Sequence, residues 1–466
     1  MDKRPNILFL MDDQHRPDLF GYAGNNVVKT PNLDKLAETG VVFHQAYTPH
    51  PQCIPARQSM MAGQLPKTCK CERFEDDLAP GYETFARLFS RYAYATVACG
   101  KLHHTGQDQM QGWTQRIGSE MYVTSNHIPG KKEEEFKSYI RPKSETRWSI
   151  EKEIKRAGIG EARQVKEDAY TVQGALNFID EYFNSPYYDK ERLQQPLLLK
   201  VSLTQPHYPY TAEADKFNYY LNRVPLYLDQ QVSEHPYLRE KEIRVGIDVS
   251  EREMRRCVAA YYSLVEKADE HFGTILDRLE YVGQDLDDWI IIYTSDHGEM
   301  LGEHSVWMKQ KFYESSARVP LIIRWPNKFE GGVTRYENVN LCDLFATLCE
   351  LTGIPIPDNL DSRSLVPLLE GQGDSWENES ISQYHGKYLM IKWDHLKYQY
   401  YGEDLPEVLF DLKRDPKETV DYIEDPEYDE IIQKFRSRRN ELGFGPNGDP
   451  NYKNAGYRSN RMEEQK

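Results

Sequence analysis

The stretch Ile7-Leu8-Phe9-Leu10-Met11-Asp12-Asp13 decides the fold of this chain, because a continuous apolar run ends in two adjacent carboxylates. Such a short run without polar alternation is typical of a strand buried on both faces of a parallel sheet. Three further runs have the same form and also end in polar residues: Ala95 to Cys99, Leu197 to Leu203 and Trp289 to Thr294. We therefore predict an α/β fold built around a large, mostly parallel sheet that helices flank.

The polar residues that follow these four runs predict a functional site at one edge of the sheet. They are Asp12 and Asp13 after the first run, Lys101 after the second, His207 after the third, and Asp296 with His297 after the fourth. In open parallel sheets the carboxyl ends of the strands lie along one edge, and ligands bind beyond it. Four separate strands would therefore bring these side chains together.

A divalent metal site is predicted at the same edge. Adjacent carboxylates such as Asp12 and Asp13 repel each other unless a cation joins them. Asp296 and His297, at another strand end, complete a set of ligands in which oxygen predominates. Oxygen ligands favour a hard cation, Ca²⁺ or Mg²⁺, while the imidazole also suits Mn²⁺ or Zn²⁺. The alternative is that Asp12 and Asp13 only cap a helix. It would leave the polar residues at the other strand end, Asp296 and His297, without an explanation.

Length and composition narrow the class of protein. The chain has 466 residues, which favours one large domain with a smaller one. Its mean hydropathy is −0.74, and it contains no apolar run of about 18 residues, the length that would span a membrane. The formal net charge of −16 argues against a nucleic-acid partner, which binds basic surfaces. We expect neither a membrane nor a nucleic-acid partner.

The seven cysteines do not indicate a disulfide scaffold in a chain of this size. A reducing compartment is the simpler interpretation. The first residues enter a predicted strand almost at once, without the hydrophobic region of a signal peptide. We therefore expect a cytoplasmic protein, or an exported one from which a signal has been removed.

The stretch Cys53-Ile54-Pro55-Ala56-Arg57 fits the pattern C-x-P-x-R. Three fixed positions recur by chance in roughly one random chain in fifty, but the sequence around them adds weight. Upstream, Pro5 to Asp13 and Thr30 to Ala37, and downstream Arg57 to Gly63, resemble the type I sulfatase family. That family converts this cysteine to formylglycine. The alternative is that Cys53 is a buried structural thiol.

The resemblance implies an alkaline-phosphatase-like fold and hydrolysis of a sulfate ester. Residue 53, as a hydrated formylglycine, would attack sulfur, and the sulfated hydrate would then collapse to the aldehyde with release of sulfate. The family's metal site combines the oxygen of residue 53 with ligands at the predicted positions. We expect one Ca²⁺, with Mg²⁺ or Mn²⁺ as alternatives, because His297 stands where many relatives have asparagine.

The resemblance also assigns roles to basic residues. Arg57 would hold the formylglycine, and Lys101 would contact the sulfate. His103 would hydrogen-bond the nucleophile, and His207 would give a proton to the leaving group. Lys309 would be the second sulfate-binding lysine, with Lys311 as a near alternative. Four further residues are candidates for shaping the pocket: Gln14, His15, Gln205 and His385.

Two domains are expected from the change of pattern along the chain. Residues 1–365 would form the catalytic α/β domain. Residues 366–466 resemble the family's C-terminal subdomain, a small antiparallel sheet with a helix. Residues 105–165 and 208–248 are rich in charge, aromatic and turn residues, which predicts insertions over the site.

The substrate is the least determined part of the prediction. We expect an exo-acting sulfatase for a sulfated mono- or oligosaccharide, matured by a formylglycine-generating enzyme. Choline sulfate is the main alternative, although a quaternary ammonium needs an aromatic cage. A phosphonate monoester or phosphodiester hydrolase shares the fold and the motif. A non-catalytic binding protein is disfavoured because the motif residues Cys53, Arg57, Lys101, His103 and His207 are all present.

Overall fold

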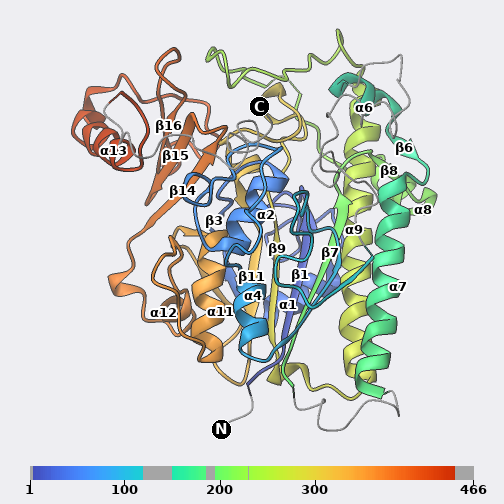
Figure 1. Ribbon diagram of the computed structural model, residues 1–466. Helices are drawn as coiled ribbons and strands as arrows, with labels where there is room; N and C mark the ends of the chain where they lie inside the picture. Colours follow the sequence, from blue (N-terminus) through green and yellow to red (C-terminus); the bar gives the residue numbers. More distant parts are fainter. Residues whose placement is uncertain (1–3, 119–148, 185–194, 229, 447–466) are drawn as a thin grey trace, which may run out of the picture.

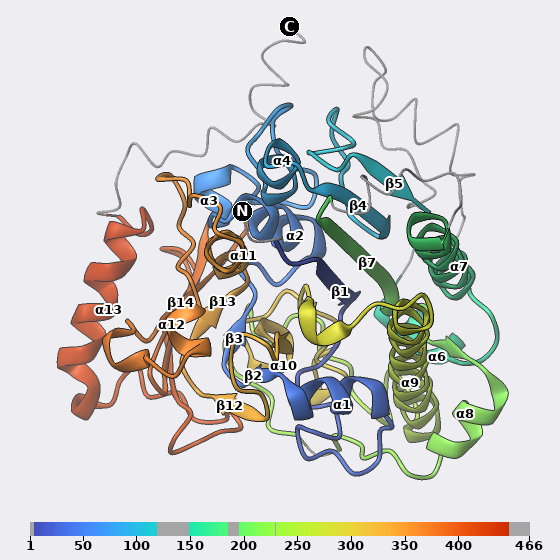
Figure 2. The ribbon, with the colours of Figure 1, turned by 90° about the horizontal axis from the view of Figure 1, so that it is seen from below.

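An eight-stranded sheet forms the centre of the computed structural model, which describes residues 4–118, 149–184, 195–228 and 230–446. Its strands are β1 (Ile7–Asp13), β2 (Val41–Phe43), β4 (Ala95–Gly100), β5 (Gln115–Ile117), β7 (Leu197–Pro206), β9 (Ile290–Ser295), β11 (Leu321–Arg324) and β12 (Val333–Arg335). In space they follow the order β12-β2-β11-β9-β1-β7-β4-β5, and helices cover both faces (Figures 1 and 2).

The four apolar runs form four neighbouring strands, β9, β1, β7 and β4, and every pairing among them is parallel. Ile7 of β1 lies opposite Leu198 of β7 and Ile290 of β9. Beyond this group β11 runs antiparallel to both β9 and β2. The predicted α/β fold with a mostly parallel sheet is confirmed.

Alternate side chains of β1 enter two different apolar cores. Phe9 and Met11 belong to the first core and Leu8 and Leu10 to the second, and all four are fully buried. This two-sided burial explains why the run contains no polar residue. The helices of the first core are α2 (Cys53–Ala62), α4 (Phe85–Arg91), α11 (Leu344–Thr352) and α12 (Val366–Leu369). Those of the second are α1 (Pro31–Thr39), α7 (Arg163–Asn184) and α9 (Glu251–Tyr281).

The C-terminal region contains a separate antiparallel sheet, as the family resemblance implied. Its strands follow each other in the order β14 (Glu379–Tyr384), β15 (Tyr388–Trp393), β16 (Leu396–Tyr400) and β17 (Val408–Asp411). Helix α13 (Asp429–Glu441) shares an apolar cluster with this sheet through Phe435. Leu365 and Val366 lie in the same core as the main sheet, and the division into domains at this point stays a proposal.

Short elements complete the described chain. Of the two predicted insertions, residues 119–148 and 229 lie outside the described residues. Strand β5 belongs to the first insertion and joins the main sheet. Four further elements of the insertions pack against α9, and β6 pairs with β8; they are α6 (Ile150–Arg156), β6 (Gly158–Ile159), β8 (Thr211–Ala212) and α8 (Ala214–Tyr220). No described helix has the length and apolarity to cross a membrane. The short elements are β3 (Ala46–Tyr47), α3 (Pro66–Cys69), α6 (Ile150–Arg156), β6 (Gly158–Ile159), β8 (Thr211–Ala212), α8 (Ala214–Tyr220), η3 (Leu286–Asp288), η4 (Glu303–Ser305), α10 (Glu314–Ala317), β10 (Arg318–Val319), β13 (Val339–Asn340), η5 (Leu341–Asp343), η6 (Gly373–Ser375) and η7 (Pro426–Tyr428).

Candidate active site

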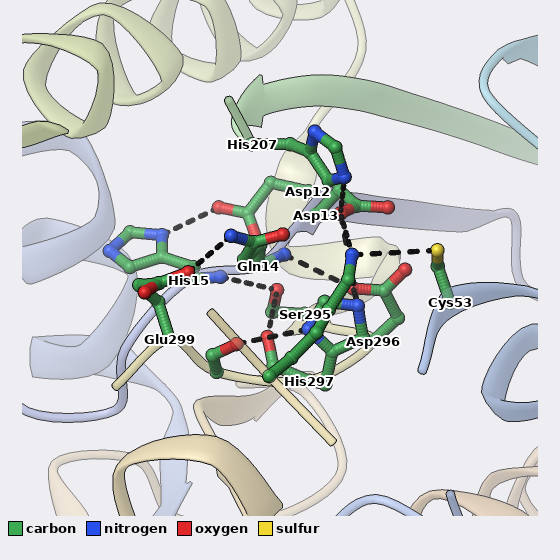
Figure 3. Close-up of polar contacts among 12 residues, drawn as sticks. Asp12, Asp13, Gln14, His15, Cys53, His207, Ser295, Asp296, His297 and Glu299 are labelled. Atoms are coloured by element: carbon green, nitrogen blue, oxygen red, sulfur yellow. Dashed lines mark hydrogen bonds and ion pairs between the residues drawn. The ribbon is translucent and has the colours of Figure 1, made fainter. Parts of the chain in front are cut away.

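Four buried residues from three elements meet at the carboxyl edge of the sheet. Asp13 ends β1, Asp296 and His297 follow β9, and Cys53 is the first residue of α2. One ligand atom from each of these residues lies within 4.8 Å of the others. Figure 3 shows the four side chains around one point, with His207 above them. The structure thus brings together residues that are hundreds of positions apart in sequence.

Asp12 does not belong to this four-residue group, although it was predicted as a ligand. Its Oδ2 accepts hydrogen bonds from His15 Nδ1 at 2.6 Å and from the Tyr293 hydroxyl at 2.8 Å. Its Oδ1 is buried and has no hydrogen-bond partner in the part of the chain that the structure describes. One oxygen of Asp12 is therefore held in place while the other is available to a ligand.

Three buried acceptor atoms at this edge find no hydrogen-bond partner among the described residues: Asp12 Oδ1, Asp13 Oδ1 and His297 Nε2. His297 Nδ1 lies 3.0 Å from the Gly298 carbonyl, so Nδ1 carries the proton and Nε2 presents a lone pair. Buried acceptors without a donor are costly, and a cation held by the four-residue group would satisfy Asp13 Oδ1 and His297 Nε2. The donor set, mostly oxygen with one imidazole, fits a divalent metal.

Arg57 ties the ligands to one another from within α2. Its Nε donates to Asp296 Oδ2 at 2.7 Å, and its Nη2 lies 3.3 Å from Asp13 Oδ2. Its Nη1 donates to the carbonyl of Lys101 at 2.8 Å and to the Ser202 hydroxyl at 2.9 Å. Burial opposes the charged form, but Asp296 and Asp13 raise the pKa of Arg57. The guanidinium is therefore a permanent positive charge beneath the site.

Two lysines supply further positive charge. Lys101 Nζ lies 2.8 Å from Asp13 Oδ2, and Lys309 Nζ lies 3.9 Å from Asp13 Oδ1. Lys309 Nζ also donates to Cys53 Sγ at 3.6 Å. The alternative lysine, Lys311, turns elsewhere: its Nζ donates to the Tyr237 carbonyl and lies 3.8 Å from the centre of that ring. The geometry therefore favours Lys309 over Lys311 as the lysine of the site.

The two carboxylates of the four-residue group differ in their pKa. Burial opposes ionisation of Asp13, but Lys101 and Lys309 hold the pKa of that carboxyl well below its usual range. At Asp296 burial raises the pKa to about 7, Arg57 opposes the rise, and the neighbouring Asp13 adds to it. A divalent cation between the two carboxylates would remove that mutual repulsion.

His207 faces the same group from the end of β7. Its Nε2 lies 4.0 Å from Asp13 Oδ1, and its Nδ1 lies 2.6 Å from the Tyr208 carbonyl. This contact places a proton on Nδ1 and directs Nε2 toward the site. Burial, then Lys309 and Lys101, holds the pKa of His207 well below its usual value. The negative charge of a bound anion would act in the opposite direction.

His103 lies in the same electrostatic environment. Its pKa is lowered well below the usual value by burial, and then by Lys101 and Arg57. Gln58 Nε2 donates to its carbonyl at 2.9 Å. The backbone of His103 has a φ of 55°, which is uncommon for a residue with a side chain. The neighbouring His104, buried against Gln58, has no contact with the four-residue group among the hydrogen bonds of the described chain.

The residues predicted to shape the pocket have different places. The backbone N–H of Gln14 donates to Asp296 Oδ1 at 3.1 Å, and His15 holds Asp12, so both support the predicted ligands from beneath. Gln205 is fully buried, and its side-chain amide makes no hydrogen bond within the described chain. His385 is exposed in the turn between β14 and β15.

Several polar residues near the site were not predicted. Glu299 accepts hydrogen bonds from the backbone N–H groups of Leu301 (2.9 Å) and Met308 (2.6 Å), and so holds the segment that carries Lys309. Lys241 Nζ donates to the carbonyl of Lys309 at 3.0 Å. No motif distinguishes these residues in the sequence, since each acts through backbone contacts that only the fold creates.

Comparisons with known proteins agree with this geometry. The family model described as Sulfatase matches residues 5–354, and a second model, described as N-sulphoglucosamine sulphohydrolase, C-terminal, matches residues 302–443. The choline-sulfatase of Rhizobium meliloti (strain 1021) is 31% identical over 440 residues, and the match covers 91% of this chain and 83% of that protein.

Two solved structures share the fold at lower sequence identity. The phosphonate monoester hydrolase of Agrobacterium radiobacter superposes with a TM-score of 0.72 at 23% identity, covering 93% of this chain and 94% of that one. A protein solved with its substrate D-glucosamine-2-N,6-O-disulfate also gives 0.72, at 20% identity, covering 94% and 97%. Because the Sulfatase model spans well over half of the chain, the protein belongs to the sulfatase family and is a sulfuric ester hydrolase of alkaline-phosphatase-like fold, as the sequence around Cys53 predicted.

Proposed function

We propose that the protein is an exo-acting sulfatase for a sulfated mono- or oligosaccharide, and that it uses a formylglycine made from Cys53 together with one divalent metal ion. The observation that carries the proposal is the setting of Cys53. Its side chain is buried in the same small group as Asp13, Asp296 and His297, with Lys309 in contact. A structural thiol would have no need of metal ligands and a lysine around it.

The metal would be held by Asp12, Asp13, Asp296 and His297 together with residue 53, and Ca²⁺ fits the oxygen-rich set best. Mg²⁺ and Mn²⁺ are the alternatives. Residue 53 enters this set through the oxygen that replaces its sulfur, and Cys53 Sγ stands in for that oxygen in the structure. When hydrated, the aldehyde supplies a hydroxyl nucleophile and a second hydroxyl through which sulfate can be expelled.

The protein's own side chains would perform the remaining tasks. Lys101 and Lys309 would bind the sulfate oxygens, which lets an anion approach a chain of net charge −16. His103 would hydrogen-bond the nucleophile and later remove a proton from the sulfated hydrate, so that sulfate is expelled. His207 would donate a proton from Nε2 to the leaving oxygen, because its Nδ1 is committed to the Tyr208 carbonyl.

The burial of the site supports a substrate that presents one sulfate at its end. Cys53 is 2% exposed, Lys101 6% and Lys309 7%, and the His207 side chain reaches only 15%. A polymer bound along its length would need a more open groove. A monosaccharide or the terminal unit of an oligosaccharide fits such a site better.

Choline sulfate is the second candidate, since a choline-sulfatase is 31% identical to this chain. A cage of aromatic rings would be required for the trimethylammonium group. One group of tyrosines in the described chain contains Tyr237, Tyr388 and Tyr401, and there Lys311 Nζ already lies 3.8 Å from the centre of the Tyr237 ring. This observation favours the saccharide.

The proposal is tested with protein produced beside a formylglycine-generating enzyme. Peptide mass spectrometry should find the aldehyde at residue 53, and Cys53→Ala should remove turnover while the fold persists. The matured enzyme is then given sulfated mono- and disaccharides, choline sulfate, a phosphodiester and a phosphonate monoester. Turnover of choline sulfate with none of any sulfated sugar would reverse the substrate choice. Unmodified cysteine in fully active protein would refute the mechanism.

A further inference from the structure

The segment that carries His207 is held from outside the sheet by helix α7. The backbone N–H of Thr204 donates to Asp168 Oδ1 at 2.7 Å, and that of Gln205 donates to Asp168 Oδ2 at 2.8 Å. On the far side of His207, Gln164 Nε2 donates to the Pro209 carbonyl at 2.6 Å. The histidine is therefore bracketed by two contacts to the same helix.

Gln164 and Asp168 are four residues apart on α7, and so they lie on one face of the helix. Both are buried, at 5% and 1% exposure. Asp168 accepts one backbone N–H on each carboxylate oxygen. Burial raises the pKa of Asp168 to about 7, and the two backbone donors oppose that rise. A buried carboxylate in this position has a cost, which suggests that the contact serves more than packing.

The orientation of the His207 ring depends on the backbone of this segment. Its Nδ1 is bonded to the carbonyl of the next residue, Tyr208, and its ring stacks on the Tyr208 ring with centroids 4.1 Å apart. Both contacts are internal to the segment. Any shift of the segment would therefore carry Nε2 away from Asp13, from which it is 4.0 Å distant.

We propose that Asp168 and Gln164 are positioning residues that hold the His207 imidazole at the place where the leaving oxygen departs. This inference rests on the proposed role of His207 as the leaving-group acid. It adds two residues of α7 that touch neither the metal ligands nor Cys53 among the described contacts. Misplacement of a catalytic group by about 1 Å can cost about 100-fold in rate.

The test is Asp168→Asn in the full-length matured enzyme. The amide keeps one acceptor but turns an N–H₂ group toward the second backbone N–H, which loses its partner. We expect kcat/KM for an alkyl sulfate to fall about tenfold more than for the sulfate of an acidic phenol, because only the alkyl ester needs a proton. In a His207→Ala background the same substitution should not change that ratio.

Asp180→Asn is the matched control, since Asp180 lies on the same helix and pairs with Arg278 at 3.0 Å, away from the site. It should leave both substrates unchanged. If Asp168→Asn does not fold, Gln164→Leu is measured in the same way. Equal losses on both esters, or a crystal structure of either variant with His207 unmoved, would overturn the inference. Absence of all sulfate-ester turnover in the wild type would instead refute the proposed function, and the crystal structures would still decide the positioning role.

Discussion

Two buried clusters of charged residues in this protein differ in how many of their polar atoms find a partner within the protein. In the C-terminal region, Lys397 is fully buried, and its Nζ donates to Glu418 at 2.6 Å, pairs with Glu314 at 2.7 Å and donates to the Phe312 carbonyl at 2.7 Å. At the carboxyl edge of the main sheet, three ligand atoms have no hydrogen-bond partner in the described chain. The clusters resemble each other in burial and in residue type.

This difference distinguishes a cluster that stabilises the fold from a cluster that binds a ligand. A buried ion pair is tolerated when every group finds a partner of opposite charge or a hydrogen bond. The Lys397 cluster meets this condition with its own side chains and joins the C-terminal sheet to the start of α10. The sheet-edge cluster does not meet it alone. The acceptor atoms of the sheet-edge cluster that have no partner are therefore evidence for a bound ligand, independent of any family resemblance.

The largest expected effect is at the sheet edge. Asp296→Ala should remove the metal and lower kcat/KM by about 1000-fold or more, since a catalytic metal supplies several kcal/mol of transition-state stabilisation. Metal analysis of the purified protein and turnover of one sulfate ester measure this. Asp288→Ala is the control, because Asp288 is an exposed residue of η3, just before the start of β9 and at the end of that strand opposite to the site. Stoichiometric metal in the Asp296→Ala protein would place the ion elsewhere.

The second-largest effect is expected on stability, at the Lys397 cluster. Lys397→Met leaves Glu418 buried without its cation, and breaking such a pair costs about 3–5 kcal/mol. The midpoint of urea unfolding should fall accordingly, while metal content per folded molecule should not change. Lys434→Met provides the comparison, because the pair of Lys434 with Glu430 is exposed to solvent and contributes little to stability. Similar shifts for both variants would show that the cluster adds nothing to stability.

The smallest effect is a change of metal preference. His297→Asn replaces a nitrogen ligand by an amide oxygen, which favours Ca²⁺ over Mn²⁺ and Zn²⁺. We expect the ratio of Ca²⁺ to Mn²⁺ affinity to rise about tenfold, a difference of about 1.4 kcal/mol, with the fold unchanged. Competition titrations of the metal-free enzyme give the ratio. An unaltered ratio would mean that the imidazole does not ligate the ion.

The central strands of the fold were predicted well, because a strand that is buried on both faces has a simple sequence pattern, a continuous apolar run. β1, β4, β7 and β9 all lie where continuous apolar runs occur, and they are neighbours in the sheet. The interior strand β11 and the edge strand β12 are both short, and the antiparallel pairing of β11 with β9 and β2 depends on contacts that no local pattern records.

The site was predictable where its residues follow strands or belong to a motif. Asp13, Asp296 and His297 come together for the geometric reason that parallel strands end at one edge. Lys309 and Lys311 could not be told apart, because the loop that carries them has no regular period. Asp168 lies on a long helix among many polar residues, and only the tertiary structure shows that it is buried against β7.

The burial of α2 has a consequence for the order of events during synthesis. All ten residues of this helix are buried, including every position of the C-x-P-x-R pattern. If Cys53 is oxidised as proposed, the oxidising enzyme would have to bind this stretch as an accessible chain, which the folded protein does not present. The proposed oxidation would then precede folding. On the same proposal, a molecule that folds with its thiol intact would have to unfold before the enzyme could oxidise it.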